Sequence, residues 1–246
     1  MRLVLLGTSG YHPTDQRQTA CMIIPEYGVM LDAGTALYRA ARFIQTRELD
    51  IFLTHAHLDH VVGLTYLLGL MPVCGLGRVR VHGQPEKLDA IERHLFAEPL
   101  FPIMPQCEFR PLESEVKLAG GGVLSYFPVC HPGGAVGFRL DWPGHALAYV
   151  TDTTAKPDAA YLSKIRGVDL LVHECHFPDA LASRTEPTGH SCTTPVAQLA
   201  KTAGAKHLVL VHIDPRGDEN DPVGIATARA IFPRTELGRD LMELEF

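Results

Sequence analysis

Short runs of apolar and β-branched residues recur along the chain, each bounded by polar or turn-forming residues. Runs of this length and composition predict buried β-strands. We expect strands at 3–6, 21–24, 29–31, 51–54, 78–81, 124–129, 136–140, 148–150, 170–172 and 207–211. After the strand at 136–140, Pro143-Gly144 predicts a tight hairpin turn.

Segments whose apolar residues have helical spacing lie between several of these strands. Apolar positions three and four apart predict helices at 35–44, at 84–96 and from residue 58 onward. A further helix is expected at 194–203, with Thr194 as its cap, Pro195 as its first residue and Gly204 at its end. Strands mixed with helices on both sides of the middle predict a layered α/β protein whose sheets are covered by helices.

Composition narrows the class of protein. The chain has 246 residues and an ordinary globular content of 46% hydrophobic and 20% charged residues, so we expect one domain over residues 1–246. A net charge of −6 argues against broad, non-specific attraction to nucleic acid. The opening apolar run is too short for a signal peptide, and no stretch reaches the length of a membrane helix. We therefore expect a cytoplasmic protein that does not enter membranes.

The segment FLTHAHLDHVVG, residues 52–63, places four metal-ligand side chains just behind an apolar strand. Imidazole and carboxylate together suit Zn²⁺, and also Mn²⁺ or Fe²⁺. His55 and His57 lie two apart in an extended segment, so they point to the same side and can hold one ion. Asp59 and His60 can then serve a second ion. The alternative is a polar turn in which Asp59 caps the next helix, but four ligand types in the order H-x-H-x-D-H make that interpretation weaker.

Other ligand-type residues also follow apolar strands, namely His131, Asp152 and His212. Each alone has an ordinary explanation as a loop histidine or a turn aspartate. Together with the cluster at 55–60 they would complete two coordination spheres, which favours the functional interpretation.

The ordered set of H-x-H-x-D-H, a lone His, a lone Asp and a final His resembles the metallo-β-lactamase superfamily of binuclear metallohydrolases. The resemblance implies a four-layer αββα sandwich and two divalent metal ions. Zinc is the expected metal, with manganese or iron as alternatives. It implies a first ion held by His55, His57 and His131 and a second held by Asp59, His60 and His212. Asp152 would bridge the two ions, and Asp32, in VMLDAG, would support the histidine turn from behind.

Longer segments resemble the ribonuclease Z and phosphodiesterase branch of that superfamily: LVLLGTSGYHPT, LLVHECHF and GHSCTTPVAQLAKTAGAKHLVLVHIDPR. This resemblance implies that Glu174 and His190 handle protons, and with Asp59 they are the expected catalytic residues. After Glu174 the chain has Cys175-His176, where those relatives have Ala-Thr. Ribonuclease Z enzymes generally insert an arm that grips transfer RNA where this chain has only its Pro143-Gly144 turn.

These features lead to a binuclear metal-dependent phosphodiesterase as the main hypothesis. Two ions would acidify a shared water, and the resulting bridging hydroxide would attack the phosphodiester. His190 would protonate the leaving alkoxide, and Glu174 would orient the His190 ring. The missing arm and the acidic charge favour a small phosphodiester or nucleotide-like substrate.

Other functions stay open at this point. Ribonuclease Z-type 3′ processing of transfer RNA is the alternative enzyme, and a non-catalytic metal-binding scaffold is the alternative from another class. A redox di-iron role ranks below both. By resemblance the expected assembly is a homodimer.

The proline-rich loop at 97–106 is interpreted equally as a substrate lid or as a connector. We interpret His173 as a buried structural residue. Ordinary surface or core positions are expected for His12, His82, His94, His145, His176 and His207.

Overall fold

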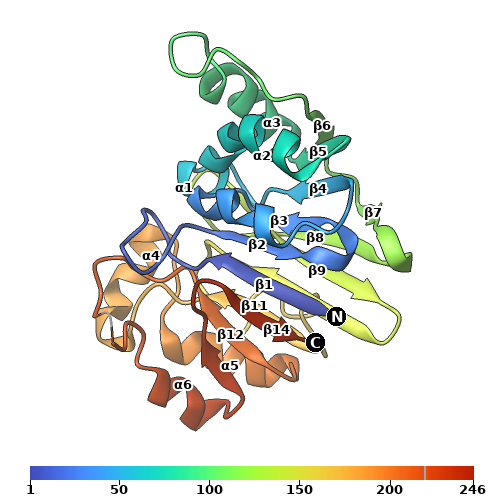
Figure 1. The fold of residues 1–246 in the computed structure, drawn as a ribbon. Coiled ribbons are helices and arrows are strands. Elements are labelled where there is room, and N and C mark those ends of the chain that lie inside the picture. Colours follow the sequence, from blue (N-terminus) through green and yellow to red (C-terminus); the bar gives the residue numbers. More distant parts are fainter. Residues whose placement is uncertain (219) are drawn as a thin grey trace. The chain divides into compact units, whose positions relative to one another are not determined.

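The computed structural model describes residues 1–218 and 220–246 (Figure 1). The chain divides into two compact units. The first comprises residues 1–120 and 240–245, and the second comprises residues 121–239 and 246. Each unit contains a mixed β-sheet with helices. The single domain expected over residues 1–246 stays a prediction.

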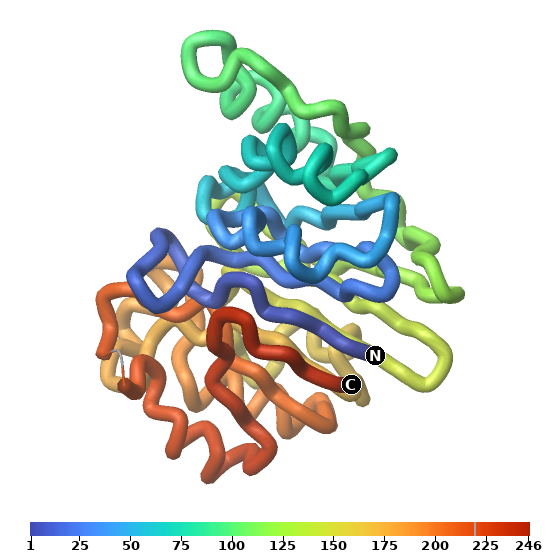
Figure 2. Tube along the Cα trace, in the orientation of Figure 1, coloured from blue at the N-terminus to red at the C-terminus, as the bar shows by residue number. Residues whose placement is uncertain are grey.

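The sheet of the first unit has the strand order β14-β1-β2-β3-β4-β5-β6. The strands are β1 (Arg2–Gly7), β2 (Cys21–Ile24), β3 (Val29–Leu31), β4 (Glu48–Phe52), β5 (Arg78–Gly83), β6 (Glu108–Pro111) and β14 (Met242–Glu245). The strands from β14 to β3 pair antiparallel, and those from β3 to β6 pair parallel. Figure 2 shows the last strand of the chain running beside the first, in the register that pairs Leu3 with Leu244. A further short strand of this unit is β7 (Glu115–Lys117).

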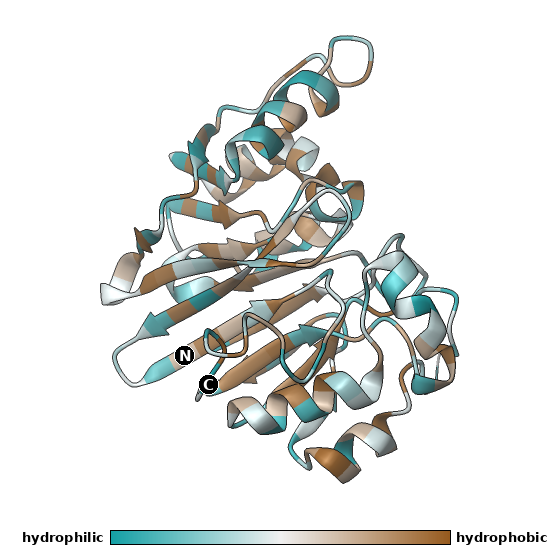
Figure 3. Cartoon of the chain, turned by 180° about the vertical axis from the view of Figure 1, so that it is seen from behind, coloured by the Kyte–Doolittle hydropathy of each residue, from teal (hydrophilic) through white to brown (hydrophobic). Residues whose placement is uncertain are grey.

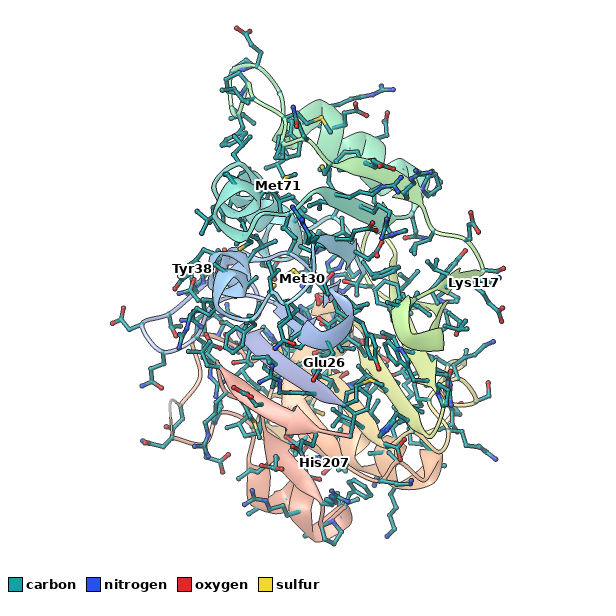
Figure 4. All side chains as sticks on the ribbon, turned by 45° about the vertical axis from the view of Figure 1, so that its right-hand side comes forward. Glu26, Met30, Tyr38, Met71, Lys117 and His207 are labelled. Atoms are coloured by element: carbon teal, nitrogen blue, oxygen red, sulfur yellow. The ribbon has the colours of Figure 1, made fainter. Side chains whose placement is uncertain are left out.

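Short helices cover one face of this sheet. They are η1 (Pro25–Tyr27), η2 (Thr35–Arg42), α1 (Leu58–Val61), η3 (Val62–Tyr66), α2 (Leu67–Cys74), α3 (Pro85–Ala90) and η4 (Ile91–Leu95), with η5 (Ala119–Gly121) at the end of the unit. Met30 of β3 lies in the core that these helices close, together with Leu37 and Leu64. In Figure 4, Tyr38 lies on the outer side of η2, and its side chain is 54% exposed.

Within residues 121–239, the strands of the second sheet follow the order β13-β12-β11-β10-β9-β8. The strands are β8 (Val123–Val129), β9 (Ala135–Trp142), β10 (His145–Val150), β11 (Leu170–Glu174), β12 (Leu208–Val211) and β13 (Thr235–Leu237). The helices are η6 (Asp179–Arg184), α4 (Thr185–Thr188), α5 (Thr193–Ala203) and α6 (Ile225–Ile231). Leu199 of α5 and Leu210 of β12 share one core, and Figure 3 shows the hydrophobic strands of this sheet beside mixed helices.

The predicted strands are all present, with shifts at some ends. The strands predicted at 21–24 and 29–31 have those bounds. The strand predicted at 51–54 is β4, which begins earlier and ends at Phe52, so His55 follows it after two further residues. Trp142 pairs with His145, which leaves Pro143 and Gly144 (φ 80°) as the predicted two-residue turn. The pattern missed β6, β7, β13, β14 and α6, most of which are short or partly exposed.

The predicted helices are confirmed in place but differ in detail. The helix predicted at 35–44 is a 3-10 helix and ends at Arg42. The helix expected from residue 58 is broken into α1, η3 and α2. Helix α5 starts one residue early, with Cys192 at its N-terminal cap, because Asp179 Oδ1 accepts the Thr194 backbone N–H at 2.8 Å. Thr194 is therefore not the cap.

Within residues 1–218 and 220–246, no helix is both long enough and apolar enough to cross a lipid bilayer.

Candidate metal centre

The first unit brings together the four ligand-type residues that follow β4. His55 and His57 lie in the extended segment before α1, and Asp59 and His60 lie on α1 itself. The ring centroid of His55 is 4.4 Å from that of His57 and 4.3 Å from that of His60. His60 Nε2 is 3.5 Å from Asp59 Oδ2. His55 and His60 are buried and His57 is exposed, so the cluster opens to the surface.

Asp32 supports this cluster from behind. Its buried carboxylate lies just after β3 and accepts hydrogen bonds from the Thr54 backbone N–H (2.8 Å), the Thr54 hydroxyl (3.0 Å) and His60 Nδ1–H (2.9 Å). A proton held on Nδ1 leaves the lone pair of His60 Nε2 available for a metal ion. Asp32 therefore contacts the histidine turn from behind, as the resemblance implied.

The glycine turn after β1 holds the other side of the cluster. The Tyr11 backbone N–H donates to Asp59 Oδ2 at 2.8 Å, and Tyr11 has a φ of 65°. This bond orients the Asp59 carboxylate. The sequence pattern did not indicate this contact.

The second unit brings together the three lone ligand candidates. His131 follows β8, Asp152 follows β10 and His212 follows β12. Asp152 Oδ1 is 3.1 Å from His212 Nε2, and Asp152 Oδ2 is 4.0 Å from His131 Nε2. The three side chains are at most 3% exposed. The two oxygens of one carboxylate therefore face two different imidazoles, which is the arrangement a bridging ligand needs.

His131 has a fixed ring orientation. Its Nδ1 lies 3.1 Å from the Gly189 carbonyl oxygen, which can accept only from a protonated Nδ1. The lone pair is then on Nε2, the atom that faces Asp152. Each half of the ligand set thus contains a histidine whose tautomer suits metal binding.

Several of these residues adopt left-handed backbone conformations. Asp32, Asp152 and His212 have φ values of 58°, 50° and 56°. For a non-glycine residue this conformation costs roughly 1–2 kcal/mol. Such strain persists where surrounding structure enforces it, and it concentrates at functional sites. Placing these three side chains at the ends of their strands therefore lowers the local stability of the backbone.

The buried Glu174 pairs with the partly buried His190 in the second unit. Glu174, the last residue of β11, has its Oε1 3.2 Å from His190 Nδ1. Its carboxylate also accepts the backbone N–H groups of Thr153 (2.7 Å) and Ser191 (3.2 Å). Burial alone would raise the pKa of Glu174, but His190 and then His212 hold that pKa below its ordinary value. An ionised Glu174 fixes the Nδ1 proton of His190 and leaves its Nε2 for chemistry.

His176 is a member of this cluster that the sequence interpretation treated as ordinary. Its ring stacks on that of His190, with centroids 4.4 Å apart and planes 19° apart. Its Nδ1–H donates to the His212 carbonyl oxygen at 2.9 Å. Burial, then His212 and His190, lower the pKa of His176 to about 4, so the stacked ring is neutral at pH 7. The departure Cys175-His176 was the only signal, and it did not by itself indicate this contact.

Other histidines have the ordinary roles expected of them. His173 is buried, with its Nδ1–H donating to the Glu174 carbonyl oxygen at 2.7 Å and its Nε2 3.0 Å from the Tyr161 hydroxyl. His82 Nε2 is 2.8 Å from Asp50 Oδ1. His207 Nε2 is 2.9 Å from Glu236 Oε1.

Known proteins share both sequence and fold with this chain. A ribonuclease Z of Acaryochloris marina is 28% identical, over all of this chain and 97% of the relative. The metallo-β-lactamase fold protein YhfI from Bacillus subtilis superimposes with a TM-score of 0.81 at 18% identity, over all of this chain and 99% of that one. A diphosphatase from the PhnP family superimposes with a TM-score of 0.75 at 24% identity, over all of this chain and 97% of that one.

These likenesses confirm the predicted α/β metallo-β-lactamase-like fold class. The ribonuclease Z relative also supports the predicted class of enzyme, a metal-dependent hydrolase of ester bonds in the ribonuclease Z-like branch. The family model described as "Beta-lactamase superfamily domain" matches residues 27–213, which contain all of the predicted ligands. This chain belongs to the β-lactamase superfamily.

Proposed function

We propose that this chain is a phosphodiesterase that works with two divalent metal ions. The proposed ligands are His55, His57, Asp59, His60, His131, Asp152 and His212. The observation that carries the proposal is the carboxylate of Asp152, whose two oxygens face the Nε2 atoms of His131 and His212. Without a cation, two imidazoles and a carboxylate buried together are costly to desolvate, whereas a cation makes the same group favourable.

The donor chemistry fits zinc best among common ions. Histidine nitrogens dominate the set and carboxylate oxygens complete it, and this mixture suits Zn²⁺, with Mn²⁺ and Fe²⁺ as alternatives. The tautomers support this assignment, because His60 and His131 each have their Nδ1 proton engaged and their Nε2 available. When bound, the ions would acidify water at neutral pH and neutralise charge on a phosphoryl oxygen.

The protein's own groups would supply the remaining chemistry. His190 would donate a proton from Nε2 to the oxygen of the leaving alcohol, since an alkoxide is a poor leaving group without one. The carboxylate of Glu174 holds the opposite nitrogen of that ring and would stabilise the charged imidazolium before transfer. The stacked ring of His176 restricts how the His190 ring can tilt.

A small phosphodiester is the proposed substrate. The alignment with the Acaryochloris relative spans 312 residues, whereas this chain has 246, so at least 66 aligned positions of the relative have no counterpart here. The hairpin between β9 and β10 is a two-residue turn and leaves no room for an arm at that place. A net charge of −6 also disfavours the binding of a long polyanion such as RNA. Because the Acaryochloris relative is named a ribonuclease Z, RNA is the second candidate substrate.

A substrate panel separates these possibilities. Zinc- or manganese-loaded protein is incubated with bis-p-nitrophenyl phosphate, with cyclic nucleotides and with precursor transfer RNA. We expect the small diesters to be hydrolysed faster than the RNA. RNA cleavage that is faster, and that is lost in His190→Ala, would reverse the order of substrates. Two bound ions with no hydrolysis of any ester would favour the scaffold. The homodimer stays a prediction, which light scattering of the purified protein can test.

Asp32→Asn should weaken metal binding by about 10- to 100-fold, the usual effect of losing a partner behind a ligand. The amide nitrogen would face His60 Nδ1, so the proton of that ring would move to Nε2 and block the ligand atom. Competition with a zinc-binding dye measures the affinity. Asp50→Asn is the control, because Asp50 is a partly buried carboxylate that, like the buried Asp32, accepts from a histidine of the first unit. Equal zinc affinity in the two variants would show that Asp32 has no part in metal binding.

A further inference from the structure

One edge of the His190 ring is held by a buried carboxylate. Glu174 Oε1 lies 3.2 Å from His190 Nδ1, at the long end of the range for such a bond. A single contact at one nitrogen lets the ring turn about that contact, and the χ2 torsion of a histidine has only broad minima. The opposite nitrogen, Nε2, therefore has a fixed direction only if a second contact holds the face of the ring.

His176 lies against that face. Its ring and the ring of His190 have centroids 4.4 Å apart and planes 19° apart. The rings of His131 and His212 also lie beside His190, with centroids 5.2 Å away, but their planes are tilted by 51° and 30°. A near-parallel contact limits the tilt of a ring more than an oblique contact does. Of these three imidazoles, His176 is the one placed to hold the His190 ring.

The His176 ring is itself fixed in position. The residue is buried, and its Nδ1–H donates to the His212 carbonyl oxygen at 2.9 Å. The Asp214 backbone N–H donates to the His176 carbonyl oxygen at 3.3 Å. The ring of Phe177 packs edge-on against the His176 ring, with centroids 4.7 Å apart and planes 89° apart. His176 is therefore tied to the segment that follows β12, and its ring is a rigid support.

We propose that His176 is a positioning residue that holds the ring of His190 in the orientation for proton transfer. The proposal rests on the proposed function and adds a residue to its proton-transfer step. In that step the oxygen of water bonds to phosphorus, and the bond from phosphorus to the leaving oxygen breaks. The leaving oxygen keeps the electron pair and takes the Nε2 proton of His190. Because His176 is buried, it acts through His190 rather than by touching the substrate.

Two substitutions at this position separate the ring from its hydrogen bond. His176→Asn keeps an N–H donor near the place of Nδ1 and removes the ring, whereas His176→Phe keeps a ring face and removes the donor. Misplacing a reacting group by about 1 Å can cost roughly 10²-fold in rate. On an alkyl diester we therefore expect kcat of His176→Asn to fall about tenfold or more, with KM nearly unchanged. His176→Phe should stay within about threefold of the unmodified chain.

A substrate that needs no proton is the control for these kinetics. On bis-p-nitrophenyl phosphate, both variants should match the unmodified chain at equal zinc content. In a chain that carries His190→Ala, His176→Asn should cause no further loss on the alkyl diester, because the ring that it positions is gone. A loss that persists in that chain, or an equal loss on both substrates, would overturn the inference. Full activity of His176→Asn on the alkyl diester would overturn it as well.

The orientation of the His190 ring is a readout that does not depend on hydrolysis. In crystals of metal-loaded His176→Phe, the ring should keep the orientation that places Nδ1 on Glu174. In His176→Asn it should turn or take more than one orientation. His176→Thr is a second ring-free variant for the case that the asparagine chain does not fold. An unchanged His190 ring in a ring-free variant would contradict the inference. If no chain hydrolyses any diester, the proposed function fails, but the ring orientation still decides the role of His176.

Discussion

His190→Ala should lower kcat/KM on an alkyl diester by about 10²- to 10⁴-fold, the usual contribution of a positioned general acid. The same change should cost no more than about tenfold on bis-p-nitrophenyl phosphate, because a nitrophenolate leaves at neutral pH without a proton. The physical reason is the position of His190, whose Nδ1 is fixed by the buried carboxylate of Glu174. Steady-state kinetics with the two substrates measure the difference.

The contrast between substrates is the informative quantity. His145→Ala is the matched control, because His145 belongs to the same sheet but begins β10, at the opposite end of that strand from Asp152. It should leave both substrates unaffected. An equal loss on both substrates in His190→Ala would mean that His190 serves the fold or the metal ions rather than the leaving group.

Asp152→Ala should lower activity on every diester by about a thousandfold or more. The interaction of bound ions with the developing charge contributes several kcal/mol, and each 1.4 kcal/mol is about tenfold in rate. The two oxygens of Asp152 face two imidazoles, so its loss should affect both ions. The measurements are kcat/KM together with the metal content after gel filtration.

A charge control accompanies this variant. Asp89→Asn also removes one carboxylate, from an exposed position on α3, and should change neither activity nor metal content.

The fold of Asp152→Ala needs a control of its own. Its alanine must adopt the φ of 50° that Asp152 has, a backbone conformation that is unfavourable for alanine. A melting temperature near that of the unmodified chain in the absence of metal therefore shows that the fold survives. Full metal content with full activity would contradict the assigned role of Asp152.

The sequence could predict those parts of the site that depend on local order along the chain. Ligand-type residues that follow apolar strands are visible as a pattern, and neighbouring parallel strands place their ends at one edge of a sheet. This logic brings Asp152, Glu174 and His212 together, since β10, β11 and β12 are adjacent and parallel. Strands such as β2 and β3 were predicted with their observed bounds because both are short and fully apolar.

Contacts that depend on packing could not be predicted in this way. The stacking of His176 on His190 joins β11 to the segment before α5, and no periodicity relates those positions. The start of α5 is set by the Asp179 side chain, fifteen residues before Thr194, rather than by a local cap. The pattern missed β14 because only Leu244 in that strand is buried, so its alternation is weak.

The most direct test of the account is a zinc-edge anomalous map of the crystallised, zinc-loaded protein. We predict two peaks per chain, each about 2 Å from nitrogen or oxygen atoms of the seven proposed ligands, with Asp152 touching both. Peaks located elsewhere, or zinc at no more than trace occupancy after careful loading, would contradict the central claim that these residues hold a pair of cations.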